Sequence, residues 1–181
     1  MDENFRSKLR RIHRVNRVLW IAILADMFIL SVIAISLWYF NVLSVPVLSH
    51  FKTYNDITLI IVIVLLFTIM YLKRTYLIPG KIIERAGRKK LNIEGTDVID
   101  FIQEFGKDAN ILAKALIIMR RYFMVIWSIA NVIVLIGFIS FIMSLHLWNF
   151  LTYGIVGLYS LVINFPKFSI VEDCYYIISN E

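Results

Sequence analysis

Residues 73–121 read KRTYLIPGKIIERAGRKKLNIEGTDVIDFIQEFGKDANILAKALIIMRR, and this polar stretch decides the fold. Long apolar stretches flank it in pairs, at about residues 18–40 and 57–76 before it and 122–145 and 147–166 after it. Apolar stretches of this length match the thickness of a bilayer rather than the size of a soluble core helix. We therefore predict an all-α integral membrane protein with four transmembrane helices in two hairpins. An amphipathic N-terminal helix precedes the first hairpin, and residues 73–121 form a helical cytoplasmic connector between the two.

The composition agrees with a single membrane domain over residues 1–181. Of the 181 residues, 60% are hydrophobic, which is more than a water-soluble chain of this size could bury. A net charge of +6 would suit nucleic acid, but no motif of a nucleic-acid-binding module is visible. The basic residues instead gather at the ends of the apolar stretches, where lipid head groups lie. The predicted partner is thus a bilayer with anionic head groups, and not nucleic acid.

The distribution of Lys and Arg predicts the orientation. Eleven of the 19 fall in residues 73–121 and six in residues 2–17, whereas the two outer connections together hold one. Since basic residues favour the cytoplasmic side, both termini are expected in the cytoplasm. The predicted lipid head-group anchors are Arg10, Arg11, Arg14, Arg17, Lys73, Arg74, Arg120 and Arg121. An alternative role for the basic N-terminal arm is docking of another protein.

Two amphipathic segments lie outside the spans. Phe5, Leu9 and Ile12 share one face of an N-terminal helix, which can lie on the membrane surface or continue into the first span. A second helix begins near Thr96, a possible N-cap. Its apolar face comprises Val98, Phe101, Ile102 and Phe105, and its acidic side comprises Asp97, Asp100 and Glu104. Anionic lipid repels such a helix, so we predict a cytoplasmic docking helix. It packs either on the N-terminal helix, with its acids near the arginines, or on a partner subunit.

One ionisable residue, Asp26, lies inside the apolar part of a span. It is eight residues from the inner end of the first span, and Asn131 is nine residues into the third, so the two lie at similar depth. An acid at this depth is costly and should face other helices or a wet cavity. We predict an intramembrane polar pair. It is either a structural hydrogen bond or part of a proton- or cation-sensing site.

Small and polar residues repeat along the third and fourth spans at spacings of three, four or seven. They comprise Ala130, Gly137, Ser140 and Ser144 in the third span and Gly157, Ser160 and Asn164 in the fourth. Such repeats are typical of close helix packing in membranes, within one hairpin or between protomers. A hydrated polar lining is the other interpretation.

No catalytic or metal-binding pattern is present. His50 and His146 fall outside the spans, and neither belongs to a set of three or four ligands at a known spacing. With a single cysteine, Cys174, the chain forms no internal disulfide. We therefore predict no enzyme, metal or cofactor. The favoured function is a non-catalytic multi-pass subunit that helps assemble or stabilise a larger membrane complex through a charged cytoplasmic docking face. The alternative is a homo-oligomeric ion channel or small transporter with Asp26 and Asn131 near the pathway.

Overall fold

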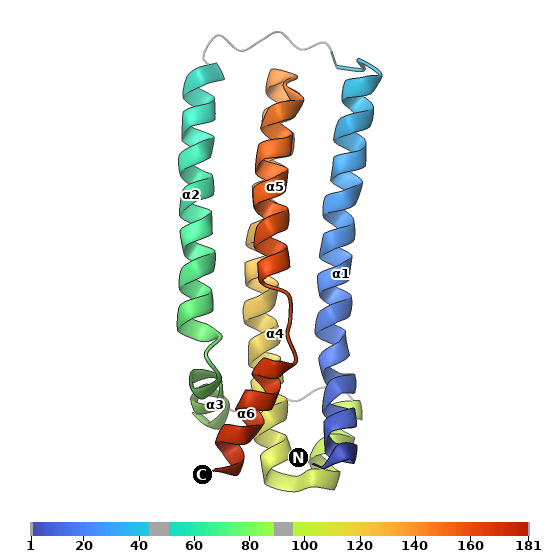
Figure 1. The fold of residues 1–181 in the computed structure, drawn as a ribbon, viewed down its shortest axis with the longest axis vertical. Helices are drawn as coiled ribbons and strands as arrows, with labels where there is room; N and C mark the ends of the chain where they lie inside the picture. Colours follow the sequence, from blue (N-terminus) through green and yellow to red (C-terminus); the bar gives the residue numbers. More distant parts are fainter. Residues whose placement is uncertain (1, 44–50, 89–95, 181) are drawn as a thin grey trace. The chain divides into compact units, whose positions relative to one another are not determined.

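The structure is a computed structural model that describes residues 2–43, 51–88 and 96–180. Every regular element in these residues is a helix (Figure 1). The helices are α1 (Glu3–Tyr39), α2 (Phe51–Tyr76), α3 (Pro79–Arg88), α4 (Thr96–Ser144), α5 (Leu147–Ile163) and α6 (Ser169–Ser179). The predicted all-α class is confirmed. Of these, α1, α2 and α4 are long and apolar enough to cross a membrane, and α5 is a shorter apolar helix of 17 residues. The chain is therefore a membrane protein.

The chain divides into two compact units, which we describe separately. The first, here called the polar unit, comprises Met1–Leu19, Leu72–Met124 and Pro166–Glu181. The second, here called the span unit, comprises Trp20–Tyr71 and Val125–Phe165. Helices α1, α2 and α4 each contribute to both units, since each has a polar end and an apolar end.

The polar unit has a core of its own. The short helices α3 and α6 pack on each other, and Ile82 of α3 and Val171 and Cys174 of α6 are buried. Leu112 and Leu116 of α4 are buried against the same cluster, and the cavity between these side chains, about 10 Å³, is too small for more than one water molecule. Packing of this quality removes the apolar sides of two short helices from water, which neither helix could do alone.

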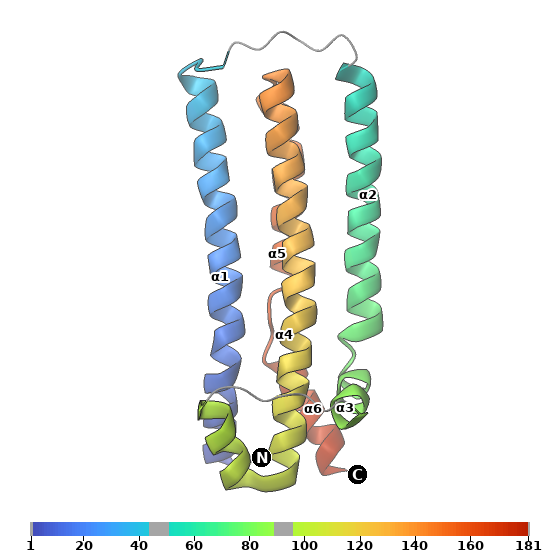
Figure 2. The same cartoon turned by 180° about the vertical axis from the view of Figure 1, so that it is seen from behind.

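In the span unit, α4 and α5 form a tight antiparallel pair. The indole N–H of Trp127 donates to the backbone carbonyl of Asn164 at 2.9 Å, and Trp127 and Leu161 are fully buried. The connection is short because Leu145 adopts a left-handed backbone (φ 58°) and α5 begins two residues later. Within this unit α1 and α2 lie on either side of the α4–α5 pair, as both views show (Figures 1 and 2).

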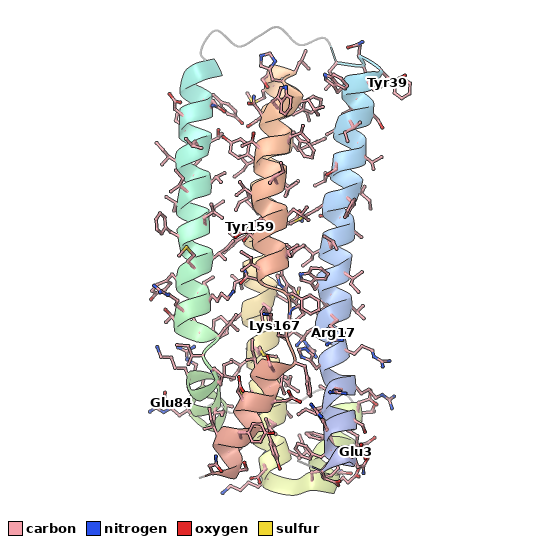
Figure 3. The ribbon with its side chains drawn as sticks, in the orientation of Figure 1. Glu3, Arg17, Tyr39, Glu84, Tyr159 and Lys167 are labelled. Carbon is pink, nitrogen blue, oxygen red and sulfur yellow. The ribbon has the colours of Figure 1, made fainter. Side chains whose placement is uncertain are left out.

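The outer faces of α1 and α2 are largely uncovered. Only 11% of the apolar stretch of α1 and 17% of that of α2 are buried in the chain, against 44% for α4. Of the two, α1 is the more exposed. Its aromatic end is open as well, since Figure 3 shows Tyr39 projecting away from the neighbouring helices.

Several expected boundaries differ from the structure. Helix α2 begins at Phe51 rather than at residue 57, because no Gly or Pro interrupts residues 51–56, although most of them are polar. Helix α5 ends at Ile163, three residues before the predicted end of the fourth span. The N-terminal helix continues into the first span without a break, which is one of the two arrangements that the sequence allowed. Residues 44–50, which belong to the predicted outer loop, lie outside the described residues.

The connector and the tail also contain structure that the sequence pattern did not reveal. The acidic helix and the helix that contains the third predicted span form one element, α4, and they meet at Gly106, whose positive φ of 74° turns the chain. Only glycine takes this conformation without strain. The tail, for which no element was predicted, forms α6.

Candidate functional site

A chain of buried polar groups crosses the polar unit. His13 and Asn16 of α1 are 2% and 0% exposed. The ring of His13 contacts the backbone carbonyl of Pro166 through Nε2 at 3.1 Å and the side chain of Asn16 through Nδ1 at 3.4 Å. The guanidinium of Arg120 donates from Nε to Asn16 Oδ1 at 2.9 Å. These bonds connect α1, α4 and the segment before α6.

The hydrogen-bond pattern assigns the protonation of His13. Pro166 offers only a carbonyl acceptor, so His13 Nε2 carries the proton, and Asn16 donates its amide N–H to the unprotonated Nδ1. Burial lowers the pKa of His13, and the charges of Arg17 and Arg120 lower it further, although the bond to Pro166 acts in the opposite direction. Burial also lowers the pKa of Arg120. His13 is therefore a neutral, fixed ring at neutral pH.

Sequence reasoning missed this network. A signal was present, because Asn16 continues the buried stripe of Phe5, Leu9 and Ile12 at the spacing i, i+4, i+7 and i+11. A polar residue in register with an apolar stripe indicates a buried hydrogen bond rather than a solvent-facing position.

Next to this network lies a basic pocket of about 290 Å³. Arg10, His13, Arg14, Arg17 and Phe168 line it. The guanidinium of Arg10 lies over the ring of Phe168, 5.3 Å from its centre, and the rings of His13 and Phe168 are 5.6 Å apart. Figure 3 labels Arg17 on α1. Among the residues that the structure describes, no acid lines the pocket.

The other basic residues of the same helix face acids. Arg6 pairs with Glu172 of α6 and Lys8 with Glu104 of α4. Arg11 approaches Asp97 of α4, with 3.6 Å between Nη2 and Oδ1. These pairs are exposed, so each contributes at most about 1 kcal/mol, but together they fix the register of α1 against its neighbours.

The acidic helix, residues 96–105 of α4, packs on α1 within the polar unit. Phe101 is 1% exposed, and the centre of its ring lies 5.0 Å from that of Phe5. Phe105 also contacts Phe5, whereas Val98 and Ile102 are half-buried at the edges. The first of the two predicted packing modes is therefore present within the chain, and the apolar face of this helix is covered. Asp100 remains exposed on its outer side.

The predicted head-group anchors fall into two groups. Arg10, Arg11, Arg14, Arg17, Lys73, Arg74 and Arg121 are exposed. Arg120 differs, because it is half-buried and donates to Asn16. Arg120 therefore has a contact within the chain that the prediction of a head-group anchor did not include. Its helical position points back toward α1, where Asn16 supplies an acceptor.

In the span unit, the predicted hydrogen bond between Asp26 and Asn131 is present. The Asn131 amide donates to Asp26 Oδ2 at 2.6 Å. The Asp26 side chain is nevertheless exposed, so one neighbour covers only part of the carboxyl group. An apolar groove of about 140 Å³ begins next to it, between Met27 of α1 and Gly154 of α5.

The small-residue repeats lie inside the α4–α5 pair. All seven predicted seam residues are buried: Ala130, Gly137, Ser140, Ser144, Gly157, Ser160 and Asn164. A methyl group added at Gly137 would lie 2.7 Å from Tyr153 Cβ, which shows how closely the helices approach. Ser144 also accepts hydrogen bonds from the His146 backbone and the Asn149 side chain at the turn. The repeat is therefore used within the hairpin.

Metal-binding groups do not cluster in the described part of the chain: no three His, Cys, Asp or Glu side chains there are placed to hold a metal ion. His146 lies at the α4–α5 turn, and His50 lies outside the described residues. Comparisons with known protein families, curated proteins and solved structures found no match to this chain.

Proposed function

We propose that this chain is a non-catalytic multi-pass subunit of a larger membrane assembly, held to its neighbours through the uncovered face of α1. The observation that carries this proposal is the exposed carboxyl group of Asp26 within an apolar span. A carboxyl group that faces lipid costs about 2.5 to 3.5 kcal/mol even on insertion-based scales. A neighbouring helix that covers Asp26 and donates a hydrogen bond to it would reduce this cost.

The surroundings of Asp26 support the same proposal. Phe28, Ile29 and Val32 follow it along α1, and each is about 60% exposed. Lipid could cover these side chains alone, but it would leave Asp26 with only its bond to Asn131. A partner helix would cover the apolar side chains and the acid together, with an interhelical hydrogen bond worth about 1 kcal/mol.

The proposal includes four spans in two hairpins, with both termini in the cytoplasm. At 1.5 Å per residue, the 17 residues of α5 extend about 25 Å, which spans a bilayer core after modest local thinning. Trp148 at one end of α5 and Lys167 beyond the other suit the two interfaces. The excess of Lys and Arg in the arm and connector supports the cytoplasmic side for the polar unit.

The charged docking face must then lie on the outer surface of the polar unit. The apolar side of residues 96–105 is covered by α1, and Asp97 and Glu104 are engaged with Arg11 and Lys8. What remains for a partner is the outer side of this helix, including Asp100 and the 42% exposed Ile99.

The test compares the native mass of the gently solubilised complex for three variants. Asp26→Leu removes every hydrogen bond at this position, and we expect it to release the partner subunits. Asp26→Asn keeps hydrogen-bonding capacity and should leave the mass unchanged. Asn131→Ala is the matched control, because it breaks the bond within the chain but leaves Asp26 free to pair with a neighbour. An undiminished complex with Asp26→Leu would contradict the proposal.

The same exposed acid supports a second candidate, a homo-oligomeric channel in which Asp26 from each copy faces a shared pathway. This candidate predicts a different response to Asp26→Asn. Ion selectivity or its pH dependence should change in reconstituted vesicles, although assembly persists. A subunit with a purely structural Asp26 would show no such change.

A further inference from the structure

The hydrogen bonds of the Asp26–Asn131 pair show which kind of group the pair still lacks. Asn131 donates its amide N–H to Asp26 Oδ2. The other end of the same amide, Asn131 Oδ1, is buried and has no hydrogen-bond partner among the described residues. The carboxylate of Asp26 accepts hydrogen bonds and does not donate them. The pair therefore lacks a donor, and the exposed carboxyl group of Asp26 can take one from outside the chain.

Two small side chains lie one helical turn from this pair. Ala22 is four residues before Asp26 in α1, and Ser128 is three residues before Asn131 in α4. At these spacings, each small residue lies on the same side of its helix as the polar residue that follows it. Within the span unit α1 and α4 run in the same direction, so both small residues lie toward the same end of the pair (Figure 2). We call Ala22, Asp26, Ser128 and Asn131 the α1–α4 face.

The α1–α4 face has the properties of a close contact between helices. Small residues let two helix backbones approach each other in a membrane. The small residues of the α4–α5 repeat serve this purpose within the chain, whereas Ala22 and Ser128 are exposed. Acyl chains carry no hydrogen-bond donor, so lipid at this face would leave Asp26 with only its bond to Asn131. A second helix can use both the small residues and the acid.

The close approach also limits the donor that the second helix can present. Backbones that meet at Ala22 and Ser128 leave room beside Asp26 for a short side chain. A lysine or arginine is long, and it would add its own cost of about 2.5 to 3.5 kcal/mol to the partner's span. An amide or a hydroxyl group is short and uncharged, and such groups commonly join transmembrane helices.

We infer that the partner in the proposed assembly is a transmembrane helix of another protein that packs on the α1–α4 face and presents a short, uncharged hydrogen-bond donor to Asp26. The donor is the amide of Asn or Gln or the hydroxyl of Ser or Thr. This inference rests on the proposed function. It adds the side of the span unit on which the partner lies and the chemistry that the partner brings.

The first experiment blocks the close approach without changing Asp26. Ala22→Leu places a large side chain where the partner's backbone would lie, and it should lower the fraction of the chain found in the native complex about fivefold or more. Because Ala22 is exposed, the variant should keep the circular dichroism spectrum of the wild type. The matched control is Thr152→Leu, which adds leucine at an exposed position of α5 and should assemble as the wild type does. Ser128→Leu repeats the test from α4 if Ala22→Leu does not fold.

The comparison with Asp26→Leu separates this inference from the proposed function. If Asp26→Leu releases the partner but the leucine variants of Ala22 and Ser128 retain it, the inference is wrong and the proposed function stands. If Asp26→Leu retains the partner, both are wrong. An equal loss in Thr152→Leu would also overturn the inference, because leucine would then act without regard to position.

The second experiment identifies the donor. A photoreactive leucine analogue is placed at Val132, which follows Asn131 and is 42% exposed, and the crosslinked peptide is sequenced by mass spectrometry. We expect an apolar segment of another protein with Asn, Gln, Ser or Thr within one helical turn of the crosslinked residue. A segment with Lys or Arg as the polar residue at that place would overturn the inference. Crosslinks to lipid alone, or only to peptides of this chain, would overturn it as well.

Discussion

A methyl group at residue 157 should loosen the α4–α5 pair. The Cβ atom of alanine at Gly157 would lie 2.5 Å from Val134 Cγ2 and 2.8 Å from the backbone carbonyl oxygen of Ala130. The valine is β-branched and has few alternative rotamers in a helix, and a carbonyl moves only with its helix. Relief of this overlap therefore requires α4 and α5 to move apart.

The magnitude follows from a comparison with Gly154 on the same helix. An added Cβ at Gly154 meets nothing within 4 Å. Both Gly→Ala changes gain about 0.5 to 1 kcal/mol of helix propensity, so this gain cancels in the difference between them. What remains is the overpacking cost at Gly157, about 1 to 3 kcal/mol. We expect Gly157→Ala to be less stable than Gly154→Ala by this amount.

The assay is reversible unfolding of the full-length protein in mixed micelles with increasing SDS, followed by circular dichroism. Gly154→Ala should match or exceed the wild type in free energy of unfolding, whereas Gly157→Ala should fall below it. Equal stability of the two alanine variants would refute the close approach of α4 and α5 at this point, and with it the assignment of the small-residue repeat to the hairpin.

Three further predictions concern the polar unit. Phe101→Ala should cost about 3 to 5 kcal/mol in free energy of unfolding, because the ring is buried. Ile99→Ala, on the exposed side of the same helix, should cost under about 0.5 kcal/mol. Similar losses in the two variants would contradict the packing of residues 96–105 on α1. The neutral state of His13 stabilises the fold fully above its ordinary pKa of 6.5, and this stabilisation is lost as the pH falls from there through the lower pKa of the folded state. His13→Gln should reduce the slope of the free energy of unfolding against pH in this range. An unchanged slope would show that other groups cause this pH dependence. Burial and the charge of Asp173 raise the pKa of Cys174 to about 12, so a maleimide at pH 8 should label it only after denaturation; rapid labelling of the folded protein would contradict its burial.

Helical periodicity and depth along a span predicted a large part of the structure. The bond between Asp26 and Asn131 followed from counting residues from the same end of two spans that run in the same direction, because the rise per residue of a helix is constant. The contact between Phe5 and Phe101 followed from two apolar faces that anionic lipid and water both disfavour. Each inference needed only the geometry of a single helix and one residue or face of matching polarity on a second helix.

The features that escaped prediction depend on contacts between distant segments. Helix α6 is short, and its stability comes from packing on α3 and not from caps or propensity. The positive φ of Gly106 could be found only from the direction of the chain on both sides. Arg120 has the same charge and the same sequence environment as Arg121, but only Arg120 reaches Asn16, so a count of basic residues treats the two alike.

The most direct test of the proposed function is the native mass of the wild-type protein, measured after gentle solubilisation from its own membranes and from a host without its neighbours. A subunit of a larger assembly should appear as a heteromeric particle in the first case and as a monomer or an unstable product in the second. A monomer from its own membranes, or the same homo-oligomer from both sources, would contradict the subunit proposal. The homo-oligomer would instead favour the channel.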